Sequence, residues 1–267
     1  MTTKLACPGS GFKMEIAANL SCSASSNRKG ILMGSVFSPT RKDVERYRRL
    51  RALSMDLNHR IIKTVPRHAY EDIGDAIGIL RNRVLQFDSA DTTSVLMDCC
   101  LYDWFENGKN VVLRYSQTHP AKPGTDQGYL LNAYLQAKYR VLVVQSVLPG
   151  AGLHCRDVLN GEELFLMDLG LSQSAKGANW ALATRTIPLG EYSMTSGAGL
   201  PIIAKKAALD ALSRIERGIQ KSLEAPGSMA LSIVRACLAA GAADYVDYAS
   251  AEAKLREPRR RPRWRWF

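Results

Sequence analysis

Apolar residues recur at two different spacings along the chain, and the change of spacing divides it into three blocks. From 40 to 138 they recur every three or four positions, as in helices that bury one face. From 139 to 203 short β-branched runs alternate with Gly-rich turns, which predicts strands. Helical spacing returns from 204 to 255. The pattern predicts an α+β fold: a helical N-terminal block, a small antiparallel sheet or barrel over about 139–203, and C-terminal helices.

The first predicted helix covers residues 39–65. Thr40 is a candidate N-cap, and Asp43 stands three residues later, where an imperfect capping box would place its acid. Pro66 is expected to end the helix, because the residue before a proline is pushed out of the α region. The predicted buried stripe consists of Val44, Tyr47, Leu50, Leu57 and Ile61.

Further helices are predicted over 68–81, over 88–106 with Asn107-Gly108 as its C-terminal stop, over 110–118, and from Thr125 or Asp126 to 138. The helix over 88–106 is apolar nearly all round, so it is expected at the centre. Asp98 and Asp103 in this helix are five residues apart, which places them on different faces. Both are therefore predicted in surface or capping roles.

The predicted strand region contains Asn160-Gly161, the strongest short signal for a type I′ hairpin. Its second arm is expected to continue to Leu169, a third arm to cover 180–187, and two short strands to cover 191–195 and 197–203. Five or six short strands favour a small barrel or a curled sheet. His154 and Cys155 are adjacent in a strand and point to opposite faces, so they are not expected to form a catalytic pair. No catalytic residues are predicted.

The chain has 267 residues and is 46% hydrophobic, enough to bury a core, so it is not a disordered protein. We expect one globular domain over 39–255 between a flexible segment, 1–38, and a disordered basic tail, 256–267. No apolar run reaches the roughly 18 residues that cross a bilayer, and no secretory signal is visible. Six scattered Cys are typical of reduced thiols, so a cytoplasmic protein is expected.

The formal net charge of +11 is concentrated in two segments. Residues 40–68 hold nine Lys/Arg against three Asp/Glu, and residues 256–267 hold six Arg against one Glu. The rest of the chain is neutral. Two basic segments on a neutral body indicate an acidic partner, either nucleic acid or an acidic protein. The alternative is a solvated helix face followed by a frayed tail.

The candidate nucleic-acid-binding residues come from both basic segments. In the tail, Arg neutralises phosphate and Trp stacks on unpaired bases. The tail also suits an anionic membrane surface, and a non-functional extension is a third interpretation. The candidates are Arg46, Arg48, Arg49 and Lys63 in the helix and Arg259, Arg260, Arg261, Arg263, Trp264, Arg265 and Trp266 in the tail.

Cys7-Pro8-Gly9-Ser10-Gly11-Phe12-Lys13 resembles the opening of the SEC-C motif, a zinc-binding segment of the form C-P-C-G-S-G-x-x-[FY]-x-x-C-[CH]. The Cys after the proline is missing, Ile16 and Ala17 stand near the closing pair, and Cys22 comes too late. Zinc needs four ligands, and this segment offers only one clear ligand. Neither a metal nor any other cofactor is therefore expected.

Between Tyr47 and Ile202 the chain contains the segments YRRLRALSMDLNHRI, SVLMDCCLYDW, YLQAKYRVLVVQSVLPGAGLHCRDVLNGEELFLMDL and ATRTIPLGEYSMTSGAGLPI. In these segments it resembles a family of uncharacterised bacterial proteins with a SEC-C-type N-terminal motif. The resemblance implies a bacterial origin and, by analogy with SEC-C modules elsewhere, partner docking.

Three functional hypotheses follow from the sequence. The first is a non-enzymatic protein that binds nucleic acid through the basic helix and the tail, because these segments carry the whole excess charge. The second is a protein–protein adaptor that docks through its β module. The third is an enzyme of unknown class with its site between sheet and helices.

Overall fold

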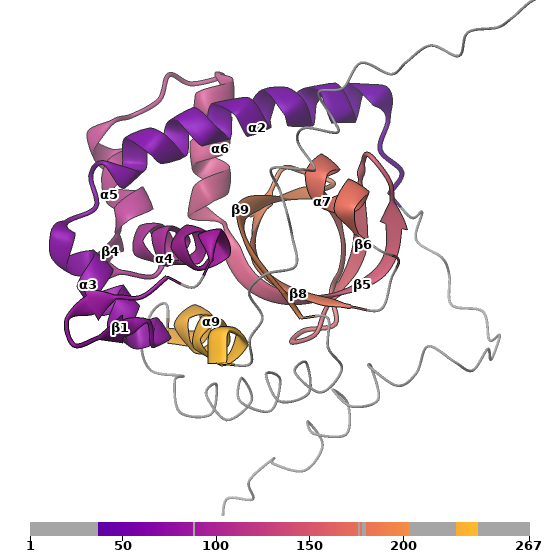
Figure 1. Ribbon diagram of the computed structural model, residues 1–267. Coiled ribbons are helices and arrows are strands. Elements are labelled where there is room, and N and C mark those ends of the chain that lie inside the picture. Colours follow the sequence, from indigo (N-terminus) through magenta and orange to yellow (C-terminus); the bar gives the residue numbers. More distant parts are fainter. Residues whose placement is uncertain (1–36, 88, 176, 178–179, 203–227, 240–267) are drawn as a thin grey trace, which may run out of the picture.

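The structure, a computed structural model, describes residues 37–87, 89–175, 177, 180–202 and 228–239. A block of helices lies beside a closed five-stranded barrel, and the long helix α2 (Arg41–Ile62) runs past both (Figure 1). The α+β prediction is therefore confirmed. None of the helices within the described ranges is long and apolar enough to cross a membrane.

Among the described residues, the helical block contains α2 and five shorter helices, together with two small hairpins, β1–β2 and β3–β4. Helix α9 packs against α3 and α4, which brings residues from the end of the chain onto the N-terminal helices. The elements are α3 (Arg67–Ile77), β1 (Leu80–Arg81), β2 (Val84–Leu85), α4 (Ala90–Tyr102), β3 (Phe105–Glu106), β4 (Lys109–Asn110), α5 (Val111–Thr118), α6 (Asp126–Leu135) and α9 (Ser228–Ala239).

Helix α2 begins as the sequence predicts and ends earlier. The Thr40 hydroxyl accepts from the Asp43 amide at 3.3 Å, and the Asp43 carboxylate accepts from the Thr40 amide at 2.8 Å, so the capping box is complete. At the other end the α-helix stops at Ile62 and the chain continues in tight turns. Pro66 is extended and forms the N-cap of α3, because proline at a helix start loses no hydrogen bond.

Asn107-Gly108 has a different role from the one predicted, and Asn160-Gly161 lies between two antiparallel strands as predicted but in a longer loop. Asn107 and Gly108 have φ of 52° and 73°, and they form the two-residue turn of the β3–β4 hairpin rather than a helix stop. Asn160 has no positive φ and belongs to a longer loop between β6 and β7. The dipeptide favours a turn in both places, but the flanking strands decide which turn forms.

The barrel is built from β5 to β9, with one short helix, α7, between its third and fourth strands. Its strands follow the order β5-β6-β7-β9-β8 and close into a ring, which confirms the predicted barrel. Four of its strand pairs are antiparallel, as predicted, whereas β7 and β9 pair in parallel. The elements are β5 (Lys138–Leu148), β6 (Gly152–Asp157), β7 (Glu163–Met167), α7 (Leu169–Ser174), β8 (Ala181–Pro188) and β9 (Ser193–Ile202).

Helix α7 explains the parallel pair. Asp168 was predicted to extend the second arm, but its carboxylate accepts from the Leu171 amide at 2.9 Å and caps α7 instead. The chain therefore continues from β7 into α7, and the strand after this helix, β8, pairs with β5. Strand β9 then returns between β8 and β7 as one strand, not as the two short strands predicted.

The barrel has its own small core, and a polar or helical element lies at each end of it. Helix α7 covers one end, where the Gly150 amide donates to the Ser172 hydroxyl at 3.1 Å. Near the other end Arg140 donates to Asp157 and Glu162, both at 2.7 Å, and to Thr186 at 3.1 Å. The core consists of Leu142, Val144, Leu153, Cys155, Leu166, Leu171 and Leu182.

A second buried arginine joins the outside of the barrel to the helices. Arg185 on β8 donates from Nε to Asp98 at 2.8 Å and from Nη2 to Asp103, and all three side chains are almost fully buried. Its guanidinium also lies 4.3 Å from the ring centroid of Tyr102 and 5.3 Å from that of Tyr139. We call Asp98, Asp103 and Arg185 the buried ion triad.

The predicted surface or capping role of Asp98 is wrong, and that of Asp103 is only half right. Asp103 is the C-cap residue of α4, with φ of −117°, so helical periodicity no longer sets the direction of its side chain. Its carboxylate turns inward to Arg185, which is 82 residues away in the sequence. Spacing within one helix carries no information about a partner on a distant strand.

Replacing Arg185 by Met should lower the free energy of unfolding by about 3–5 kcal/mol, because two buried carboxylates lose their cation. Urea denaturation measures this loss. The control is Arg49→Met, which breaks an exposed pair with Asp126 and should cost at most about 1 kcal/mol. Equal losses in the two variants would show that the triad does not stabilise the fold.

Stability should also depend on pH through Asp103. Burial raises the pKa of this carboxyl to about 6, although Arg185 opposes the rise. Because the folded pKa lies above the unfolded one, the contribution of Asp103 is complete below about pH 4 and is lost as the pH rises through about 6. The free energy of unfolding of the natural protein, minus that of Asp103→Asn, should therefore fall between pH 4 and 7. A constant or rising difference would contradict this sign.

Candidate nucleic-acid interface

The four basic residues predicted on the first helix all lie on α2, but the structure brings only two of them together. Arg46 is half-buried and Arg49 is exposed, and both lie next to α6. Arg48 is exposed on another side of the helix, since two residues correspond to about 200° of rotation. Lys63 is the C-cap, about 25 Å along the axis from Arg46 at 1.5 Å per residue.

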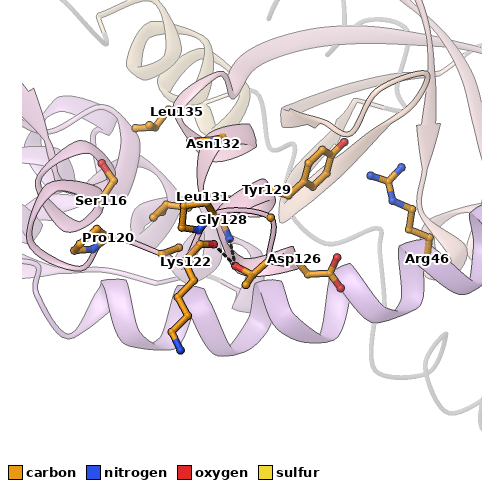
Figure 2. A pocket seen from close by; sticks show the side chains of 14 residues that line it. Arg46, Ser116, Pro120, Lys122, Asp126, Gly128, Tyr129, Leu131, Asn132 and Leu135 are labelled. Atoms are coloured by element: carbon orange, nitrogen blue, oxygen red, sulfur yellow. Dashed lines mark hydrogen bonds between the residues drawn. The ribbon is translucent and has the colours of Figure 1, made fainter.

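Arg46 stacks on an aromatic ring. Its guanidinium carbon lies 4.8 Å from the ring centroid of Tyr129 on α6, and Tyr129 is 37% exposed. Figure 2 shows both side chains at the same margin of a cleft. A guanidinium on an exposed ring offers a charge to a phosphate, while the ring offers a face to a base.

Arg49 forms an ion pair that solvent can reach. Its Nε donates to Asp126 at 2.6 Å, and the two side chains are 62% and 42% exposed. Exposed pairs of this kind contribute about 0–1 kcal/mol, because water and salt screen them. Arg49 can therefore exchange Asp126 for a competing phosphate at little cost.

The cleft beside this pair has a volume of about 690 Å³ and is lined by α6, the loop before it and Arg46. The exposed Lys122 adds a third cation. Thr125 closes the loop by accepting from the Gly128 amide at 3.2 Å and donating to the Lys122 carbonyl at 2.7 Å, as the dashed lines in Figure 2 show. A Cβ on Gly128 would lie 3.1 Å from that carbonyl, so glycine allows the close approach.

The turn between β8 and β9 adjoins the same surface. A Cβ on Gly190 in this turn would lie 4.0 Å from the hydroxyl of Tyr129. Tyr192 follows it, with its ring centroid 5.8 Å from that of Phe37. Burial raises the pKa of Tyr192, and the charge of Arg46 acts against this rise. The cations of α2, the exposed ring of Tyr129 and the β8–β9 turn thus form one continuous surface.

Sequence reasoning missed Tyr129 and Lys122. The signal for Tyr129 was its place beside, not within, the apolar stripe of α6. A single exposed aromatic residue is common on protein surfaces, so this position alone would not have identified a site. The predicted tail residues, from Arg259 to Trp266, and the SEC-C-like segment with Cys7 and Cys22 lie outside the described residues.

One group of side chains has the composition of a metal site. Ligand atoms of Asp98, Cys99 and Asp103 lie within 4.8 Å of one another. Arg185 already occupies both carboxylates, however, and burial raises the pKa of the Cys99 thiol well above its usual value. A protonated thiol and two carboxylates held by a guanidinium do not suit a cation such as zinc.

The adjacent His154 and Cys155 point apart, as the strand pattern predicts. The imidazole of His154 packs edge-on against Phe165, with the ring centroids 4.8 Å apart, whereas Cys155 lies in the barrel core. Burial raises the pKa of Cys155 to about 12. The geometry therefore provides no thiolate–imidazole pair.

The buried thiols should resist alkylation. Cys99, Cys100, Cys155 and Cys237 are free and buried, and burial raises the pKa of each. Iodoacetamide at pH 7.5, followed by peptide mass spectrometry, should label these four positions slowly in the native protein and quickly in urea. Rapid native labelling of Cys99 would show that its carboxylate neighbours leave it reactive.

No curated protein and no solved structure matches the chain in the comparisons made. A family model, the "Family of unknown function (DUF7986)", matches residues 41–222, about two-thirds of the chain. The matched region starts with α2 and includes the whole barrel, so it covers the surface described above. The chain therefore belongs to DUF7986, a family of unknown function.

Proposed function

We propose that this protein is a non-enzymatic binder of single-stranded nucleic acid. The observation that carries the proposal is the stack of Arg46 on the exposed ring of Tyr129, beside the β8–β9 turn. Proteins that bind single strands combine a cationic path for the backbone with aromatic faces on which bases stack. Both components occur here within one surface.

The roles of the individual side chains follow from their chemistry. Arg46, Arg49 and Lys122 neutralise phosphates, and each contact releases counterions from the nucleic acid. Tyr129 provides the stacking face, worth about 1–3 kcal/mol per base in comparable sites. Arg48 and Lys63 lie elsewhere on α2, so they add general attraction for an anionic strand.

The strand order of the barrel supports the proposal. The barrel has the strand arrangement of an OB-fold. Its strands lie in the order β5-β6-β7-β9-β8, the third and fifth strands, β7 and β9, are parallel, and the helix α7 follows the third strand. OB-folds bind oligonucleotides on their second and third strands and on the loops after the first and fourth. Here the loop after the fourth strand is the β8–β9 turn, and the second strand, β6, carries the exposed Arg156. The support is by fold-level analogy.

The basic tail extends this proposal. Its alternating Arg and Trp, from Arg259 to Trp266, supply the same two components in a segment attached to the globular domain. The competing proposal is an adaptor that docks on a protein through the barrel, with the SEC-C-like N-terminal segment as a second docking element. Captured partners that survive nuclease treatment would favour the adaptor.

The test is a charge-neutralising double variant, Arg46→Gln with Arg49→Gln. Its affinity for labelled 20-nucleotide dT or rU should fall about tenfold near 0.1 M salt. The slope of log affinity against log salt should become shallower by about 1.4, since each lost phosphate contact removes about 0.7. Fluorescence anisotropy across a salt series measures both quantities.

The matched control is Arg81→Gln with Arg83→Gln, which removes the same charge from the exposed β1–β2 hairpin and should change affinity much less. A chain without residues 257–267 measures the tail separately. If both double variants lose the same affinity, the loss reflects only non-specific attraction between positive charge and the nucleic acid. That result would contradict the assigned surface. If neither the α2 variant nor the truncation changes affinity, nucleic-acid binding is not the function.

A further inference from the structure

The cleft beside Arg46 and Tyr129 continues along one face of α6. The helix residues that line this part recur every three or four positions, and residues at that spacing share a face. They are Gly128, Leu131, Asn132 and Leu135. Figure 2 shows Ser116 and Pro120 on the far side of the cleft from Tyr129. These residues carry no charge, so they can contact a base but do not attract a phosphate.

Asn132 offers a free amide in this uncharged part of the cleft. Its side chain is exposed, and no group of the described residues forms a hydrogen bond with its amide. Side chains on a helix lean toward the helix N-terminus, so that of Asn132 covers the preceding turn, where Tyr129 lies. Residues three apart on a helix have Cβ atoms about 5–6 Å from each other, so one flat base can contact both side chains.

Tyr129 has one ring face left for a base. The guanidinium of Arg46 covers the other face, with its carbon 4.8 Å from the ring centroid. In Figure 2 the ring lies between Arg46 and Asn132, so the remaining face is on the side of the amide. The cleft volume of about 690 Å³ falls within the range of about 300–1,000 Å³ that ligand pockets have. A base can therefore stack on Tyr129 and turn its edge to Asn132.

The chemistry of the amide distinguishes the bases. Asn132 presents one kind of donor, Nδ2–H, and one acceptor, Oδ1. Adenine presents the complementary pair on one edge, because N7 accepts and the N6 amino group donates. The same edge of guanine has two acceptors, N7 and O6, so only half of the pair forms. Cytosine and thymine are smaller than the purines, so they bury less of the ring of Tyr129.

We propose that Asn132 makes this surface select adenine within a single strand. The N7 atom of adenine accepts from the Asn132 amide, its N6 amino group donates to Oδ1, and its ring stacks on Tyr129. Arg46 and Lys122 neutralise the adjoining phosphates. This inference rests on the proposed function, to which it adds a preferred base.

The test compares four single-stranded DNAs of 12 nucleotides with the full chain. One is oligo-dT, and in the other three every third thymine is replaced by adenine, guanine or cytosine. The adenine strand should bind about fivefold more tightly than oligo-dT, at the lower end for a bidentate contact because solvent reaches Asn132. The guanine and cytosine strands should stay within about twofold of oligo-dT. Fluorescence anisotropy at one salt concentration measures all four, and equal strand charge keeps the phosphate contribution the same.

Variants locate the preference on one side chain. Asn132→Ala removes the amide at an exposed helix position, where alanine is well tolerated. The adenine strand and oligo-dT should then bind within about twofold of each other. The matched control is Gln127→Ala, which removes an amide from the same helix but outside the cleft. It should keep the full fivefold preference.

Each contrary outcome has a distinct meaning. Equal affinity of the natural protein for all four strands, or a preference that survives Asn132→Ala, would overturn the role of Asn132 and leave the proposed function standing. Loss of the preference in Gln127→Ala as well would show that the cleft amide does not set it. Absence of binding to every strand would overturn the proposed function and this inference together.

Discussion

The orientation of the barrel against the helices depends on one guanidinium. Arg185 projects from the outer wall of β8 and is held by carboxylates at two points of α4, so it fixes both the distance and the rotation between the two parts. A purely apolar contact of similar area would tolerate sliding, because hydrophobic burial is not directional. The cost is the desolvation of three charges, and the rings of Tyr102 and Tyr139 stack on the cation.

The barrel places a buried arginine on each side of its wall. Tyr139 pairs with Arg185 across β5 and β8, and the next pair is Arg140 with Thr184. Because successive strand residues face opposite sides, Arg140 points into the barrel and closes one end, whereas Arg185 points out to the helices. Two adjacent positions of one sheet thus hold the barrel closed and attach it to its neighbours.

This attachment also positions the proposed nucleic-acid surface. With β8 anchored on α4, the turn after β8 lies beside α6, where Tyr129 meets Arg46. Cations on α2 would be an ordinary feature of an isolated helix. They become part of a candidate site because α6 and the β8–β9 turn of the barrel lie next to them.

The sequence by itself determined the features that depend on residues close together in the chain. These are the α+β division, the start of α2 at its capping box, the barrel region over about 139–203 and the opposite faces of His154 and Cys155. Periods of 3.6 and 2 residues and local caps encode these features. Tertiary structure decided the burial of Asp98 and Asp103, the parallel β7–β9 pair and the meeting of Arg46 with Tyr129. Each of these depends on a partner, or on a chain path, that local sequence patterns do not encode.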